Sequence, residues 1–136
     1  MSTVESERTS CLPGAVACCF GAAMGLAAWT LTAWARAYCD AGYEAGGRLE
    51  LNALFPVTAL AGGMTALAAL AVARRLSRHA PPLVRRCLPP LSVLCATVLL
   101  AWWFFATVGT LSDYPGDSGN CPASNIPPQW PGWIPA

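Results

Sequence analysis

Long stretches without a charged residue alternate with short charged ones along the chain. The uncharged stretches are Leu12–Ala35, Leu51–Ala73 and Cys87–Ser112. Each is long enough to cross the hydrocarbon core of a bilayer, which takes about 20 helical residues. Backbone groups inside a bilayer have no water to bind, so a crossing segment must be helical. The pattern predicts an all-α integral membrane protein with three transmembrane helices, which we place at about 12–35, 55–73 and 91–111.

Basic residues are concentrated between the second and third predicted spans. The loop 74–86 holds five of the chain's eight basic residues, namely Arg74, Arg75, Arg78, Arg85 and Arg86. Cytoplasmic loops of membrane proteins collect Arg and Lys, so this loop is expected inside the cell. The predicted topology therefore has the N-terminus inside and the C-terminus outside. Basic clusters also bind nucleic acid. Because long apolar stretches flank this cluster, we instead expect it to lie beside lipid head groups, and we predict no nucleic-acid partner.

This topology divides the chain into three parts. Residues 1–11 form a short cytoplasmic tail, 12–112 the transmembrane domain, and 113–136 an irregular, Pro-rich extracytoplasmic tail. Two alternatives remain: cleavage of the first span as a signal peptide, and a two-span protein in which 55–73 does not insert. The segment before the first span argues against signal-peptide cleavage. It carries two Glu and one Arg, whereas a signal peptide begins with a net positive charge.

The overall composition agrees with a membrane protein. Charged residues make up 11% of the chain and hydrophobic residues 55%, whereas globular chains have roughly 25% charged residues. The chain has no Lys and is rich in Ala, which is typical of a GC-rich bacterial genome. We therefore predict a multi-pass protein of a cell membrane, specifically a bacterial cytoplasmic membrane.

Small residues recur on one face of each of the first two spans. Gly21 and Gly25 form a GxxxG pair, and Gly62 and Ala66 belong to a small-residue face in the second span. Small residues let two helix backbones approach closely, which drives association where lipid offers no hydrophobic force. We expect these faces to pack together, although an Ala-rich chain also produces such stripes by chance.

The seven cysteines match no zinc-binding pattern, because the chain contains no C-x-x-C. In the predicted topology only Cys39 and Cys121 lie outside the membrane on the exterior side, where disulfides persist. They are the predicted disulfide pair.

Cys18 and Cys19 form a vicinal thiol pair within the first span. Such a pair in a first span is similar to that of the small three-span mercuric-ion transport proteins, and the resemblance is limited to this dipeptide. In that family paired thiolates pass a soft metal across the membrane, and soft metals prefer thiolate. The resemblance implies an alternative function, a soft-metal or thiol-redox membrane transporter that uses Cys18 and Cys19 as metal ligands. Packing is the simpler role, because buried Cys usually serves as a small hydrophobe.

Chemistry-bearing residues are scarce elsewhere. No ionisable Asp, Glu, Lys, Arg or His lies deep in a span, where ion-coupled transporters place them, and His79 has no acid or Cys nucleophile near it in sequence. Arg36 is expected on the helix surface, paired with Asp40 four residues on or holding a lipid phosphate. We predict a non-enzymatic accessory or interaction subunit without a cofactor, which binds another membrane protein or itself.

Aromatic residues mark two further places. Trp102 to Phe105 follow one another deep in the third span. Four consecutive residues cover all sides of a helix, so some of these rings are expected to pack against the other spans, and a site for an aromatic or lipidic ligand is the alternative. In the tail, Trp130 and Trp133 are candidates for the outer head-group layer. The tail otherwise serves as a linker or a cap, or as a polyproline recognition segment.

Overall fold

The computed structural model of this protein describes residues 3–42, 44–108 and 119–135, with side chains from Pro13 onward. Its helices are α1 (Thr3–Cys39), α2 (Ala45–Leu76) and α3 (Pro82–Thr107). All three are long and apolar enough to cross a membrane. The predicted all-α architecture with three helices of spanning length is therefore confirmed for the described part of the chain.

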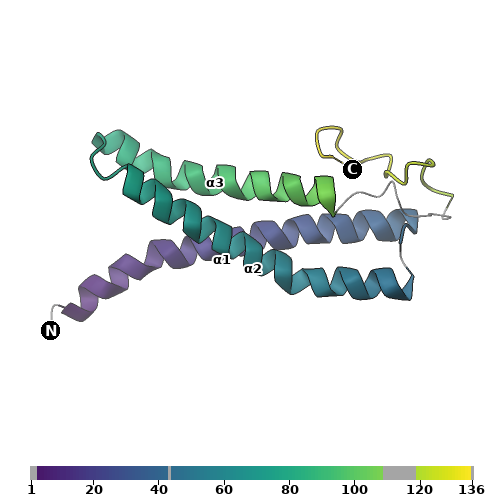
Figure 1. Cartoon of the computed structure of the whole chain (residues 1–136), viewed down its shortest axis with the longest axis horizontal. Helices are drawn as coiled ribbons and strands as arrows, with labels where there is room; N and C mark the ends of the chain where they lie inside the picture. The colour runs from purple at the N-terminus through teal and green to yellow at the C-terminus, as the bar shows by residue number, and fades with distance from the viewer. Residues whose placement is uncertain (1–2, 43, 109–118, 136) are drawn as a thin grey trace.

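The three helices run alternately up and down (Figure 1). The short turn between α2 and α3 lies toward the end of the molecule from which the N-terminus projects. The connection between α1 and α2 lies at the opposite end, together with the C-terminal segment. We refer to these two ends as the arginine end and the cystine end, after residues described below.

The arginine end differs from the predicted loop 74–86. Arg74 and Arg75 belong to the last turn of α2, and α3 begins at Pro82, so most of this segment is helical. The third span is predicted to start at about residue 91, directly after Pro89 and Pro90, but both prolines lie inside α3. Proline is well tolerated at the first helical position, so Pro82 starts the helix a full two turns earlier.

α2 bends in its first half, as Figure 1 shows. Pro56 lies inside this half of the helix. A proline in a helix interior cannot donate a backbone hydrogen bond, and its ring clashes with the carbonyl one turn earlier, so it kinks the helix. The bend lets α2 cross α1 obliquely.

Buried side chains form two clusters, one toward each end of the molecule. At the arginine end, Ala17, Ala66, Leu70 and Val93 bring the three helices together. At the cystine end, the cluster joins α1 and α3 to the C-terminal segment and contains Ala28, Ala35, Cys39, Ala41, Phe104, Phe105, Trp130 and Ile134. The C-terminal segment is therefore part of the packed structure.

Candidate functional site

Helices α1 and α2 meet at their small residues. A Cβ atom built on Gly21 would lie 2.6 Å from the Cβ of Ala66 and 2.8 Å from the carbonyl carbon of Gly62. A Cβ atom on Gly25 would collide with the backbone of Thr58 in the same way. Only glycine permits so close a backbone approach. The small-residue faces therefore contact each other within the chain.

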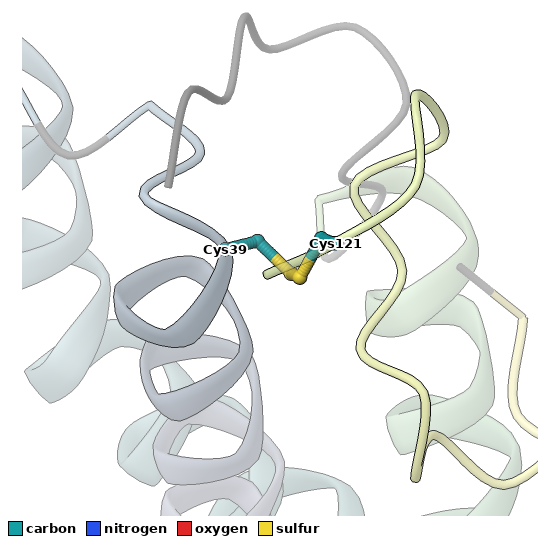
Figure 2. The surroundings of a disulfide bond; sticks show 2 residues. All are labelled: Cys39 and Cys121. Atoms are coloured by element: carbon teal, nitrogen blue, oxygen red, sulfur yellow. A yellow bond between two sulfur atoms is a disulfide. The ribbon is translucent and has the colours of Figure 1, made fainter. Parts of the chain in front are cut away.

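Cys39 and Cys121 are joined by a disulfide bond (Figure 2). Their Cα atoms are 5.4 Å apart, within the ordinary range for a disulfide, although the residues are separated by 82 positions. Cys39 is the last residue of α1 and is buried. The bond therefore fastens the C-terminal segment to the end of α1.

The C-terminal segment 119–135 forms successive turns without a helix or strand. Trp130 is buried, its indole N–H donates to the carbonyl of Ile134 at 3.1 Å, and its ring meets Phe105 edge-on at 5.9 Å. Trp130 thus packs on α3 rather than on the head-group layer, whereas Trp133 is exposed. This segment covers the cystine end as a cap, and we refer to residues 119–135 as the cap.

Arg36 faces the interior of the cystine end. Its side chain is 1% exposed, and Nη2 donates a hydrogen bond to the carbonyl oxygen of Val108 at 2.7 Å. The expected surface placement beside Asp40 was wrong, because α1 ends before Asp40. Asp40 has a left-handed φ of 52°, and the N–H of Ala41 donates to the carbonyl of Arg36 at 3.0 Å, which is the ordinary closing motif of a helix.

The vicinal thiols are not directed at one site. Cys18 lies at the helix interface, where a Cβ on Gly63 would be 3.1 Å from its sulfur, whereas Cys19 is exposed. Adjacent residues on a helix point about 100° apart, so this separation follows from the backbone. The described residues contain no group of three or more His, Cys, Asp or Glu side chains that could hold a metal ion.

An open groove of about 910 Å³ lies among the three helices at the arginine end. Four of the five clustered arginines line it: Arg74 and Arg78 from α2 and its end, and Arg85 and Arg86 from α3. Most of its remaining lining is apolar and comes from all three helices. The structure therefore places the arginines around a cavity. Its volume lies within the usual range for small-molecule sites, about 300–1,000 Å³.

Comparison with protein families, curated proteins and solved structures finds no match. The groove, the cap and the outer helix faces are therefore the features from which a function can be inferred.

Sequence reasoning missed the groove, although its pattern is visible in the chain. Leu70 and Arg74 are four residues apart and share one face of α2, and Arg78 follows at the same step just beyond the end of the helix. On α3, Arg85 and Arg86 precede Pro89 and Pro90 at the same spacing. This pattern is visible only if α3 extends back to Pro82, whereas the sequence predicts that the third span starts at about residue 91.

The outer face of α3 carries large side chains. Trp102 and Trp103 are 48% and 60% exposed, and Leu99 is 69% exposed. The sequence predicts that some rings of the aromatic run 102–105 meet the other helices. Phe104 and Phe105 are buried in this way, whereas Trp102 and Trp103 are more exposed, because four consecutive helical residues cover all sides of the helix.

Proposed function

We propose that the protein is a non-enzymatic accessory or interaction subunit of a bacterial cell membrane, which binds another membrane protein or a second copy of itself. The supporting observation is the outer face of α3, which exposes Leu99, Trp102 and Trp103. The small-residue faces of α1 and α2 are occupied within the chain, so a partner helix would have to use a different surface.

The two exposed tryptophans give this face polar N–H groups, which a purely aliphatic lipid-facing surface lacks. No hydrogen bond from either indole N–H is found among the residues that the structure describes, whereas Trp29 donates to the carbonyl of Leu51 at 2.7 Å. Trp102 and Trp103 lie about 7 Å before the end of α3, at 1.5 Å per residue. An indole N–H below the membrane surface gains an acceptor from a neighbouring chain or a lipid carbonyl.

For the orientation, we propose that the arginine end faces the cytoplasm and the cystine end the exterior. Two independent signals support this assignment. The clustered arginines flank the turn between α2 and α3, which lies toward the end from which the N-terminus projects (Figure 1), and cytoplasmic segments collect such charges. The Cys39–Cys121 bond lies at the opposite end, and disulfides persist outside the cytoplasm. A reporter fused after Arg78 that is active only in the exterior compartment would contradict it.

Site-specific photo-crosslinking in the native membrane tests the association. A photoreactive side chain at Leu99 should yield a discrete crosslink to a second polypeptide, and the same probe at Leu60 on α2 should not. Leu60 is the matched control because both residues are 69% exposed.

The crosslink from position 99 should disappear when Trp102 and Trp103 are both changed to Leu, since specific association requires that face. Equal crosslinking from positions 99 and 60, or crosslinking to lipid alone, would refute the proposal.

A further inference from the structure

The groove at the arginine end has a charged mouth and an apolar stem. The charged part comes from the end of α2 and the start of α3, on either side of the short turn between them. Its apolar part is formed by residues such as Val16 and Phe20 of α1 and Leu94 of α3. From Arg85 to Leu94 the groove extends about 13 Å along α3, at 1.5 Å per residue.

The mouth of the groove holds four positive charges, all on exposed side chains. Arg74 lies in the last turn of α2 and Arg78 in the turn just beyond it, so both positive charges belong to the same helix end. Arg85 and Arg86 add two further positive charges from α3, and no acidic side chain from Pro13 onward lines the groove among the described residues. Guanidinium groups bind phosphate oxygens through paired N–H donors, which a single Lys ammonium cannot do.

The stem excludes a simple soluble anion as the full occupant. Val16, Phe20 and Leu94 are all exposed on the groove side of a spanning helix. A phosphate ion alone would leave this apolar length empty or filled with unrelated hydrocarbon. A molecule with an anionic head and an acyl chain satisfies both parts at once, and basic pockets between spanning helices bind such lipids.

We propose that this groove binds one anionic phospholipid, with its phosphate between the arginines of α2 and α3 and an acyl chain along the apolar stem. The lipid comes from the leaflet next to the α2–α3 turn. It holds the two helix ends together by neutralising their mutual repulsion. This proposal is independent of the partner on the outer face of α3, because the groove lies between helices of one chain.

Native mass spectrometry of the purified full chain in a neutral detergent tests the head-group contacts. Phosphatidylglycerol and phosphatidylcholine with identical acyl chains are titrated separately. The wild-type chain should bind one phosphatidylglycerol in preference to phosphatidylcholine. Arg74→Gln and Arg85→Gln should each weaken binding about fivefold, the effect of one arginine near an anionic lipid.

Arg75→Gln is the matched control, since Arg75 is exposed at the same helix end but does not line the groove. Its phosphatidylglycerol binding should be unchanged. An equal loss in Arg75→Gln and Arg74→Gln would show general surface attraction and overturn the proposal, as would equal binding of the two lipids by the wild-type chain.

A second pair of variants tests the acyl chain. Leu94→Trp should fill the stem and weaken phosphatidylglycerol binding, whereas Leu91→Trp should not. Leu94 is 46% and Leu91 55% exposed, and only Leu94 lines the groove. Glycerol 3-phosphate should compete only weakly, because it lacks the chain. Competition at the lipid's own concentration, or identical binding by both Trp variants, would mean that the groove holds a phosphate group and no lipid.

Discussion

Arg36 of α1 donates a hydrogen bond to the main-chain carbonyl of Val108, directly beyond the end of α3. Cys39, one helical turn further along α1, is bonded to Cys121 of the cap. The last turn of α1 therefore holds both the end of α3 and the C-terminal segment. Any variant that breaks one of these two contacts should loosen the cystine end and leave the arginine end intact.

Replacing Arg36 by Met removes the donor to Val108 while keeping an unbranched side chain of similar length. Hydrogen bonds to charged groups contribute about 1.5–3 kcal/mol, so the thermal midpoint of the detergent-solubilised protein should fall. Circular dichroism during heating measures this change. Arg75→Met, at an exposed position, is the control and should unfold like the wild-type chain. An unchanged midpoint for Arg36→Met would show that the bond to Val108 is dispensable.

Removing the disulfide with Cys39→Ser and Cys121→Ser should release the cap. The bond closes a loop with a sequence separation of 82, for which the chain-entropy model gives a stabilisation of about 4.5 kcal/mol. Limited proteolysis should then cut within 119–135 much faster, because Trp130 loses its contact with Phe105.

Cys87→Ser with Cys95→Ser serves as the control, since both are exposed free thiols. Its cap should resist protease as the wild-type cap does. Equal protection of the cap in all three proteins would mean that apolar packing alone holds it.

Gly62→Ala should destabilise the protein through the contact between α1 and α2. A Cβ at this position meets the carbonyl group of Gly21, with the carbonyl carbon 2.8 Å away, and overpacking of this kind costs about 1–3 kcal/mol. Gly46→Ala is the matched control in the same helix, since a Cβ there has nothing within 4 Å. It should be neutral or stabilising by up to about 1 kcal/mol, because Ala favours helix. A Gly62→Ala protein that melts like the wild type would contradict the close contact.

The helices were predictable because bilayer thickness imposes a length that the uncharged runs display directly. The contact between Gly21 and Gly62 was predictable for a similar reason. Two helices can pack closely only through faces made of small residues, and the first two spans each carry one such face. Cys39 and Cys121 were the remaining candidates once topology had removed the other cysteines. Each of these inferences needed only a local pattern and one physical constraint.

The groove and the orientation of Arg36 needed the three-dimensional arrangement. The environment of Arg36 depends on where α3 ends and on the fact that Asp40 lies outside the helix. Neither can be read from the four-residue spacing between Arg36 and Asp40. The groove depends on the crossing of α2 over α1 and on α3 starting at Pro82. A proline pair usually marks a helix boundary, and here it lies inside the helix.

Cys18 and Cys19 should behave as two unrelated thiols. A membrane-permeant maleimide should modify exposed Cys19 rapidly and Cys18 slowly, because Cys18 is packed against Gly63. Mercuric ion should then bind them without the affinity gain of a chelating pair, so Cys18→Ser should leave the affinity at Cys19 nearly unchanged. Titration of the purified protein with mercuric chloride measures both values. A large loss of affinity on Cys18→Ser would show that both thiols ligate one ion and would restore the soft-metal transport hypothesis.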